Sequence, residues 1–420
     1  MRGRHTFAWM ISVDEAMRLV LDSVGSLPSE RCKLHAAQGR TLRAAVRADR
    51  DGPPFDRATL DGVCLRFAEW EAGRREFTLA GTQAAGAEPV AAPGEGACLE
   101  IMTGAPVPAP CDAVVRVEDL ERSGDRIRIR DDAKFASGTG IHRRGSDFAA
   151  GATLLEPGCR LTGRELAIAA SCGCSELEVT VEPRIAVLTT GDELVDVDDE
   201  PKPHQIRRSN DLALKAVLQS AGFSRIELNH LPDNAQAISW NMERLLQQAD
   251  VVIVTGGVSK GRFDHLPAVL EDLGVTKHFH GVAQRPGKPM FFGTFARPGD
   301  FLHPEDTRVV AVFALPGNPV SSFTCAHRYV LPGLDRMSGR RPAPAETVAL
   351  VATTTAHPEL TLFLPVRRSC GDDGRGLAAI QSTNTSGDFA SIATTDGFVE
   401  VSAGTPALAA GSAVRFFSWT

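Results

Sequence analysis

Between residues 184 and 334 the sequence alternates short apolar runs with segments of helical periodicity, and this alternation constrains the fold more than any other feature. The runs typical of strands are RIAVLTT, RIELNHL, DVVIVTGG and VVAVFALPG. The segments typical of helices are SNDLALKAVLQSAG, AISWNMERLLQQA, LPAVLEDLG and SSFTCAHRYVLPGL. Strands that alternate with helices of this length form βαβ crossovers, so the pattern predicts a central parallel α/β sheet domain with helices on both faces.

The segments on either side of this region have the pattern of β structure. From residue 48 to 147, pieces such as EFTLAG and DRIRIR alternate with Gly/Pro turns, and after about Ser338 the chain is again rich in β-like pieces. A chain of 420 residues is too long for one ordinary core. The predicted domains are a helical/β linker domain at 1–48 and 148–182, a small inserted β module at 49–147, the α/β domain at 183–336 and a C-terminal β barrel or sandwich at 337–420.

Composition excludes several classes of protein. Apolar residues make up 43% of the chain and the net charge is -7, so extensive wrapping of nucleic acid is not expected. No apolar run approaches the roughly 20 residues that cross a bilayer, and the opening MRGRHTFAWM lacks the pattern of a secretory signal. The nine scattered cysteines suit a reducing compartment, with Cys172 and Cys174 as small thiols in preference to a metal or redox pair. A cytoplasmic protein with neither nucleic-acid nor membrane partners is expected.

Three predicted strand ends continue into glycine-containing loops, TTGDEL, TGGVSKGRFD and LPGNPVSS. In an open parallel sheet, ligands bind outside the carboxyl ends of the strands. Glycine permits close backbone approach, and the neighbouring hydroxyls and amides can hold phosphate oxygens, although one such loop alone could reflect turn geometry. Three loops on one edge favour an anionic ligand. The candidate binding residues in these loops are Gly191, Gly256, Gly257, Ser259, Pro316, Gly317 and Asn318.

The same loops carry the carboxylates Asp192, Glu193 and Asp264, which would repel a phosphate unless a hard cation lay between them. Mg²⁺ takes such oxygen ligands. The alternative is that Asp192 or Glu193 caps the following segment, and that Asp264 is the N-cap of the helix in HLPAVLEDL. The stretch RPGKPMFFG adds Arg285 and Lys288, which suit an oxyanion or, alternatively, form a solvated surface pair.

Three further islands lie in or beside the β module: PPFDRATLDGV, IMTGAPVPAP and IHRRGSDFAAG. Together with TTGDEL, SNDLAL, TGGVSKGRFD, RPGKP and LPGNPVSS, they resemble, in order, the motifs of the molybdopterin molybdenumtransferase family. That family includes the bacterial molybdenum-insertion enzymes and the E domain of gephyrin. The likeness runs from about Ser12 to Leu334, and TSGDFASIATTDGF extends it into the C-terminal segment.

The resemblance implies a four-part subunit that forms a homodimer, with an active site between the sheet domain of one subunit and the β module of the other. It implies adenylylated molybdopterin and molybdate as substrates, Mg²⁺ as the cofactor, and AMP as the leaving product while molybdenum stays on the dithiolene. Other proteins of molybdenum cofactor biosynthesis are further partners that it allows.

The resemblance also assigns roles to particular residues. The catalytic residues that it implies are Asp61, Thr103, Asp147, Glu193, Asp233 and Asp264. The Mg²⁺ ligands that it implies are Asp192, Glu193, Asp233 and Asp264. The residues for molybdate are Arg285, Lys288, Ser321 and Arg367, the last as the counterpart of a C-terminal-domain arginine.

The sequence departs from the family pattern at three places. The usual MDGYA reads LDGVC, the first lysine of KPGKP is Arg285, and the RRRGED-like stretch reads HRRGSD. Arginine keeps the charge of lysine but changes its geometry, which bears on the oxyanion more than on the reaction class. The alternatives are therefore an insertase that uses tungstate, or a paralogue that binds molybdenum cofactor or acts as a scaffold without turnover. The five retained acids and Thr103 favour the enzyme.

Overall fold

The computed structural model describes residues 10–258, 265–299, 307–385 and 387–420. Contacts between Cα atoms divide the chain into two compact units, and each is considered by itself. Unit 1 comprises residues 1–44, 157–163 and 176–420, and unit 2 comprises residues 45–156 and 164–175. These units cut across the linker domain predicted at 1–48 and 148–182, so the domain boundaries remain a prediction.

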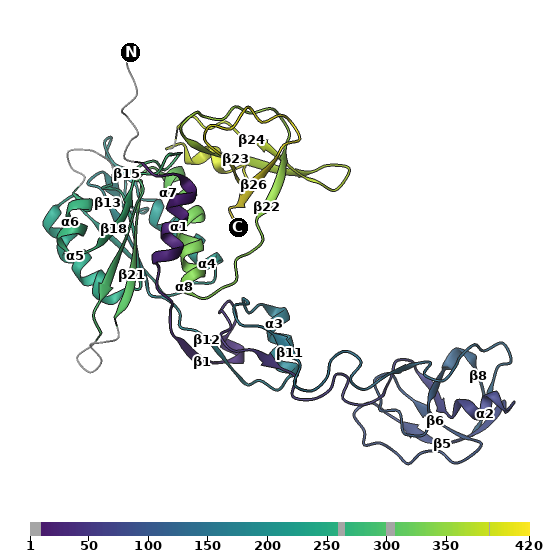
Figure 1. The fold of residues 1–420 in the computed structure, drawn as a ribbon. Helices are drawn as coiled ribbons and strands as arrows, with labels where there is room; N and C mark the ends of the chain where they lie inside the picture. The colour runs from purple at the N-terminus through teal and green to yellow at the C-terminus, as the bar shows by residue number, and fades with distance from the viewer. Residues whose placement is uncertain (1–9, 259–264, 300–306, 386) are drawn as a thin grey trace. The chain divides into compact units, whose positions relative to one another are not determined.

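Unit 1 is built on a six-stranded sheet (Figure 1). In spatial order its strands are β16 (Ile226–Leu231), β13 (Ile185–Thr190), β17 (Val251–Thr255), β21 (Arg308–Leu315), β20 (Phe291–Arg297) and β18 (Thr276–His280). The first four are parallel to one another, as the alternating pattern predicts. β13 and β17 are buried along their whole length because both faces of the sheet are covered.

Helices cover the two faces of this sheet, and alternate strand residues face different cores. Ile185 and Val187 belong to one core, whereas Ala186 and Leu188 belong to the other. The first core is shared with α1 (Val13–Ser23), α4 (Asn210–Ser220), α7 (Pro319–Cys325) and α8 (Leu331–Met337), and the second with α5 (Ala235–Gln248) and α6 (Leu266–Asp272). The predicted fold class, a multidomain α/β plus β protein, is confirmed.

The N-terminal helix α1 belongs to this α/β core. Ser12 is its N-cap, because the Ser12 hydroxyl accepts a hydrogen bond from the Glu15 N–H at 3.1 Å. Its apolar stripe, Val13, Ala16 and Val20, is buried against the sheet.

The sheet also contains two strands, paired antiparallel, that the sequence pattern did not predict. β20 runs antiparallel to both β21 and β18. The sequence pattern missed these two strands for separate reasons. β18 reads TKHFH, which has no apolar run, and β20 begins within RPGKPMFFG, which was interpreted as a loop.

The predicted continuous helix at 321–334 is interrupted by a π-helical segment, η3 (Ala326–Val330), between α7 and α8. The Leu331 N–H bonds to the Ala326 carbonyl, five residues back. Pro332 follows in the first turn of α8 and has no N–H to donate to the carbonyl four residues earlier. The missing donor accounts for the wider turn at this point.

The C-terminal segment forms a closed barrel, one of the two architectures expected from the sequence. Its strands in spatial order are β23 (Thr361–Cys370), β24 (Gly376–Ile380), β22 (Glu346–Leu350), β26 (Ala413–Ser418) and β25 (Gly397–Val401). β25 pairs back onto β23 and closes the barrel, and β19 (Gln284–Arg285) adds to β23 from outside. The 3₁₀ helix η4 (Phe389–Ile392) precedes β25.

Consecutive side chains of η3 fasten the barrel to the α/β sheet. His327 contacts the carbonyl of Trp419 at 3.2 Å through Nε2. Arg328 donates through Nε to Glu400 on β25 at 2.8 Å, and both side chains of this ion pair are 5% exposed. A buried ion pair of this kind holds the two layers in one register even where its net free energy is small.

Two pairs of strands join the segments that flank the β module. β1 (Ser29–Lys33) pairs antiparallel with β12 (Glu176–Thr180) in unit 1, beside the 3₁₀ helix η1 (Leu34–Ala36). In unit 2, β2 (Val46–Arg47) pairs antiparallel with β11 (Thr153–Leu155), and helix α3 (Gly163–Ser171) follows β11 in the chain. Cys172 and Cys174 after α3 have free thiols, and burial raises the pKa of Cys174.

The β module of unit 2 is a six-stranded sheet with an apolar core on each face. Its strands in spatial order are β7 (Ala113–Arg116), β4 (Gly62–Leu65), β6 (Ala97–Ile101), β5 (Glu76–Gln83), β9 (Arg126–Ile129) and β8 (Leu120–Ser123). Three smaller pieces complete it: α2 (Phe67–Glu71), the 3₁₀ helix η2 (Val117–Asp119) and the pair β3 (Arg57–Ala58) with β10 (Ile141–His142).

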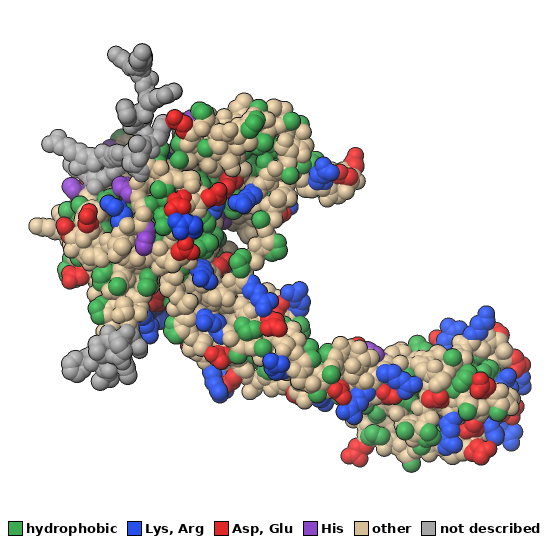
Figure 2. Space-filling view, viewed as in Figure 1, with side chains coloured by type: hydrophobic (Ala, Val, Ile, Leu, Met, Phe, Trp, Pro, Cys, Tyr) green, Lys and Arg blue, Asp and Glu red, His purple; other side chains and the backbone are tan. Residues whose placement is uncertain are grey.

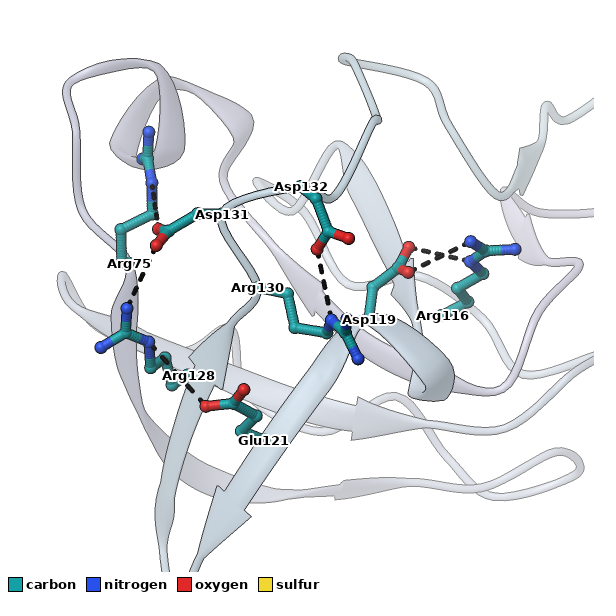
Figure 3. Close-up of polar contacts among 8 residues, drawn as sticks. All are labelled: Arg75, Arg116, Asp119, Glu121, Arg128, Arg130, Asp131 and Asp132. Carbon is teal, nitrogen blue, oxygen red and sulfur yellow. Dashed lines mark hydrogen bonds and ion pairs between the residues drawn. The ribbon is translucent and has the colours of Figure 1, made fainter.

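Exposed arginine–carboxylate pairs flank the β8 edge of this sheet (Figure 3). Figure 3 also draws Arg116–Asp119, in which Arg116 comes from β7 and Asp119 is 17% exposed. With their N–O separations, the pairs are Arg75–Asp131 (3.7 Å), Arg128–Asp131 (3.3 Å), Arg128–Glu121 (3.9 Å), Arg130–Asp132 (3.2 Å) and Arg116–Asp119 (2.8 Å). Exposed pairs contribute about 0–1 kcal/mol each. Their charges nevertheless disfavour pairing of this open edge with another strand.

Acidic and basic side chains are interspersed on the face of the molecule drawn in Figure 2. In the described part of the chain, no helix is both long enough and apolar enough to cross a bilayer.

We expect Glu400→Gln to destabilise unit 1, because it leaves the buried Arg328 charge without its main partner. The expected loss is roughly 3–5 kcal/mol of unfolding free energy, measured by urea denaturation. Asp131→Asn is the matched control, since it removes the carboxylate from an exposed pair and should cost about 0–1 kcal/mol. Similar small losses for both variants would contradict a fastening role for the buried pair.

Candidate active site

The carboxyl ends of three neighbouring strands meet at one edge of the unit 1 sheet. In the parallel register Thr189 of β13 lies beside Thr255 of β17, and Thr255 lies beside Leu315 of β21. The loops after these strands border a cavity of about 550 Å³. Its lining residues are Thr189, Thr190, Glu193, Leu194, Ile206, Arg207, Arg208, Ser209, Asn210, Asp233, Thr255, Gly256, Gly257, Val258, Pro289, Pro316, Gly317, Asn318, Pro319 and Gly387.

The fold requires glycine at some positions of these loops and not at others. Gly256 has φ +95°, and a Cβ there would lie 2.7 Å from the Thr190 carbonyl oxygen, so the fold itself requires glycine. Gly317 has neither a positive φ nor a clash, since an added Cβ would lie 3.5 Å from the Gly256 Cα. Its carbonyl accepts a hydrogen bond from Asn210 Nδ2 at 2.8 Å. Among the described glycines of these loops, Gly317 alone has neither a positive φ nor a steric reason to be glycine, and close approach of a ligand would supply a reason.

Three predicted carboxylates lie at the acidic side of this edge. Glu193 and Asp233 line the cavity, and the Asp192 carboxylate accepts a hydrogen bond from the Asp233 N–H at 3.1 Å. Partial burial raises the pKa of Asp233, and the negative charges of Asp192 and Glu193 raise it further, while a contact with the Thr190 hydroxyl opposes them. The site therefore concentrates negative charge that the protein only partly compensates.

Among the described residues, no group of three His, Cys, Asp or Glu side chains is arranged to hold a metal ion. The proposed ligand Asp264 lies outside the described residues, as does Ser259. Helix α6 begins at Leu266 with His265 at its N-cap position, so the cap predicted for Asp264 is not the one in the structure. The donor set of Asp192, Glu193 and Asp233 is chemically suited to a hard cation.

Sequence reasoning missed the basic side of the cavity. The chain returns to the cavity through β14 (Leu194–Val195) and β15 (Ile206–Arg207), and this brings Arg207 and Arg208 to its wall. Arg208 is held by Asp196 at 2.5 Å and by the buried Asp211 at 3.4 Å. The signal was the arginine pair directly before the SNDLAL motif.

The first turn of α4 also borders this wall. Ser209 at its N-cap position and Asn210 line the cavity, and the Ser209 side chain does not cap the helix. Backbone N–H groups at a helix N-terminus are partly positive, so this end of α4 favours a negatively charged ligand. The buried Thr255 hydroxyl at the end of β17 has no hydrogen-bond partner among the described residues, which leaves one more donor for such a ligand.

The basic RPGKP loop adjoins the cavity through Pro289, which lines it. Arg285 is exposed and Lys288 is half-buried, and neither is a lining residue. Ser321, also predicted to hold the oxyanion, is buried within α7. Arg367 is exposed on β23 of the barrel.

The remaining predicted residues belong to unit 2. The Asp61 carboxylate accepts hydrogen bonds from the Thr103 N–H at 2.6 Å and hydroxyl at 2.9 Å, so two residues predicted separately are in contact. These two bonds lower the pKa of Asp61. Asp147 lies 2.9 Å from Nε2 of His142, whose Nδ1 faces the Arg57 guanidinium at 3.2 Å. Since the guanidinium can only donate, Nε2 of His142 carries the proton and donates to Asp147.

Comparisons with known proteins cover nearly the whole chain. Three family models match: the MoeA N-terminal region (domain I and II) at residues 11–173, the probable molybdopterin binding domain at 186–336 and the MoeA C-terminal region (domain IV) at 347–419. A protein of Synechocystis sp. named molybdopterin molybdenumtransferase is 37% identical over 98% of this chain and 100% of its own length. A Bacillus subtilis protein of the same name is 30% identical, covering 96% and 93%.

A solved structure of a molybdopterin biosynthesis protein is also similar to this chain. The crystal structure of molybdopterin biosynthesis moeA protein from Pyrococcus horikoshii aligns with a TM-score of 0.77 at 29% identity. The alignment covers 98% of this chain and 99% of that one. The likeness therefore extends through both units and the barrel.

We expect Asp233→Asn to raise the melting temperature at neutral pH. A raised pKa means that the folded protein binds the Asp233 proton more tightly than the unfolded chain does. Ionised Asp233 therefore destabilises the fold above its usual pKa of 3.8. The stability gain of the variant should be present at pH 7 and should narrow as the pH falls towards 3.8. Thermal melts across this range measure it.

The control is Asp61→Asn, because the pKa of Asp61 is lowered and its neutralisation should not stabilise the protein. MgCl₂ added at pH 7 should raise the melting temperature of the wild type more than that of Asp233→Asn. A variant less stable than the wild type at pH 7 would show that Asp233 is not under electrostatic strain.

Proposed function

The chain belongs to the molybdopterin molybdenumtransferase family and is a transferase of molybdenum cofactor biosynthesis, and from this premise we propose that it inserts molybdenum from molybdate into adenylylated molybdopterin. In the proposed reaction water cleaves the anhydride bond and AMP leaves, while the two dithiolene thiols bind molybdenum and their protons leave with a molybdate oxygen as water. One observation supports this most directly. A single cavity of about 550 Å³ unites three strand-end loops, two arginines and two carboxylates.

The basic wall of the cavity is suited to the phosphates of adenylylated molybdopterin. Arg207 and Arg208 line it, and Arg208 is oriented by Asp196 and Asp211 before any ligand arrives. The N-terminus of α4 and the open backbone at Gly317 add N–H groups at the same wall. Binding the pyrophosphate here would hold its scissile bond against the acidic side of the cavity.

The acidic side is suited to Mg²⁺. Asp192, Glu193 and Asp233, together with Asp264, are the proposed ligands, and the raised pKa of Asp233 indicates a concentration of charge that a divalent cation would relieve. When bound, Mg²⁺ would offset negative charge on the leaving phosphate. Without it, these carboxylates would repel the substrate.

The oxyanion side of the proposed site is the RPGKP loop. Arg285 and Lys288 are proposed to bind molybdate beside the cavity that Pro289 lines, with Arg367 and Ser321 as the further proposed residues. Two cations on one short loop suit a doubly charged tetrahedral oxyanion. Proximity of the bound oxyanion to the dithiolene would then favour transfer.

A homodimer is the proposed assembly. Every residue that lines the cavity belongs to unit 1, whereas Asp61, Thr103 and Asp147 belong to unit 2. We propose that unit 2 of one subunit supplies these residues to the cavity of the other.

AMP release from adenylylated molybdopterin tests the reaction. The wild type should release AMP when both molybdate and Mg²⁺ are present, and Glu193→Gln should lower the rate by about 10²-fold, the effect typical of removing one electrostatic group from a site. Glu227→Gln is the matched control, because Glu227 is an exposed acid of β16 that pairs with Arg244 and does not line the cavity.

No AMP release under any condition would favour the non-catalytic binding or scaffold paralogue. Faster release with tungstate than with molybdate would favour the tungstate-using enzyme.

Mixing two inactive variants tests the shared site. Asp61→Ala and Asp233→Ala chains, each inactive alone, should recover part of the activity when mixed, because one of the two sites in a hybrid dimer would have both carboxylates. Hybrid dimers should be verified by a tag on one chain. Verified hybrids without activity would contradict a site shared between subunits.

A further inference from the structure

Gln284 is a fully buried polar side chain beneath the RPGKP loop, and all its hydrogen-bonding groups are used within the protein. Its Oε1 accepts a hydrogen bond from the Tyr329 hydroxyl. Its Nε2 donates to the Gly287 carbonyl at 3.1 Å and to Cys325 Sγ at 3.4 Å. Gln284, Cys325 and Tyr329 are each buried with 0% exposure. A buried carboxamide is costly unless satisfied in this way, so the side chain has one favourable arrangement.

The RPGKP loop packs directly on this side chain. Gly287 has φ +94°, and a Cβ added there would lie 2.5 Å from both Gln284 Nε2 and Cys325 Sγ. Only glycine therefore fits between the loop and the carboxamide beneath it. The close contact transmits the position of Gln284 to the loop backbone between Arg285 and Lys288.

Backbone hydrogen bonds also hold the RPGKP loop, one at Gly287 and one at Lys288. The Val282 N–H bonds to the Lys288 carbonyl at 2.9 Å, and the Met290 N–H bonds to the Gly287 carbonyl at 3.2 Å. The Gly287 carbonyl thus accepts both a backbone and a Gln284 hydrogen bond. On the outer side Arg285 pairs with Leu362 of β23. The loop is held from inside by Gln284 and from outside by the barrel.

The partners of Gln284 lie on the helix that also borders the cavity. Asn318 and Pro319 line the cavity at the start of α7, and Cys325 is the last residue of the same helix. Tyr329 follows in η3, where the wider turn directs it to Gln284 while Arg328 contacts the barrel. Gln284 therefore connects the basic loop to the helix that positions one wall of the cavity.

We propose that Gln284 is a positioning residue for the tetrahedral oxyanion substrate. Through Gly287 it sets the separation between the charges of Arg285 and Lys288 and the cavity, and the Tyr329 hydroxyl fixes Gln284 in turn. This inference rests on the proposed function, in which those two cations bind molybdate. In this inference Gln284 contributes to oxyanion specificity from beneath the loop and itself contacts neither substrate.

Two variants of different severity test the inference. Tyr329→Phe removes one hydrogen bond, and Gln284→Met removes all three at nearly constant volume. Each should raise the molybdate concentration for half-maximal AMP release, by about tenfold for Gln284→Met. The dissociation constant for AMP, measured by calorimetry, should change less than about twofold, since the cavity wall is unchanged.

Thr180→Val controls for a loss of stability alone. It removes another buried hydrogen bond of unit 1, from the Thr180 hydroxyl to the Ser338 carbonyl at 2.6 Å, and should lower the melting temperature with both constants unchanged. A positioning role also predicts non-additivity. In a Lys288→Ala background, Gln284→Met should add less than about twofold to the molybdate requirement, because the group that it positions is gone.

The outcomes separate the two proposals. If Lys288→Ala raises the molybdate requirement but Gln284→Met does not, or if their effects simply multiply, the positioning role is overturned and the proposed function stands. If Lys288→Ala leaves the molybdate requirement unchanged, both the oxyanion role of the loop and the inference built on it are overturned. A parallel loss of AMP and molybdate binding in Tyr329→Phe would indicate a general structural role and would also overturn the inference.

Discussion

Backbone hydrogen bonds between β13, β17 and β21 align three strand ends within one residue of register, and the candidate site depends on that alignment. The strands can end together because apolar side chains on both faces are buried by helices, which fixes the register of each strand. The loops that follow are then neighbours irrespective of their distance in sequence. Charged groups that would be scattered in the unfolded chain become the two walls of one cavity.

Those walls differ in how far the protein compensates their charge. Arg208 is held by two acids, so the basic wall is ordered by its own ion pairs. Within the described part of the chain, no cation pairs with Asp233 on the acidic wall, and burial together with like charges raises the pKa of Asp233. Sites that bind charged ligands commonly contain an ionisable group with a shifted pKa, because the charge of the bound ligand then compensates the charge of that group.

Elements of the fold and of the candidate site could be predicted from the sequence where the interactions that determine them are local or periodic. The α/β order followed from apolar runs such as VVIV that alternate with segments of helical periodicity such as AISWNMERLLQQA. The shared position of the glycine loops followed because the carboxyl ends of parallel strands lie at one edge of the sheet. β18 was missed because its pairing with β20 is made by a strand without an apolar run. Arg207 and Arg208 were missed because no short-range pattern shows that residues 194–208 fold back to the cavity. The role proposed for Asp61 and Thr103 depends on assembly of the subunits, which no local pattern encodes.

The π-helical turn at 326–330 also limits how the length of this chain can vary during evolution. Deleting one residue there would remove the residue that the wider turn accommodates, while Pro332 would still have no N–H for an ordinary α-helical hydrogen bond. All five residues of this turn are buried, so a deletion would disturb the packing between α7 and α8. The barrel, joined through Arg328, would lose its alignment with the sheet. Insertions and deletions among relatives are therefore expected at surface hairpins, such as residues 371–375 between β23 and β24, and disfavoured in this one turn.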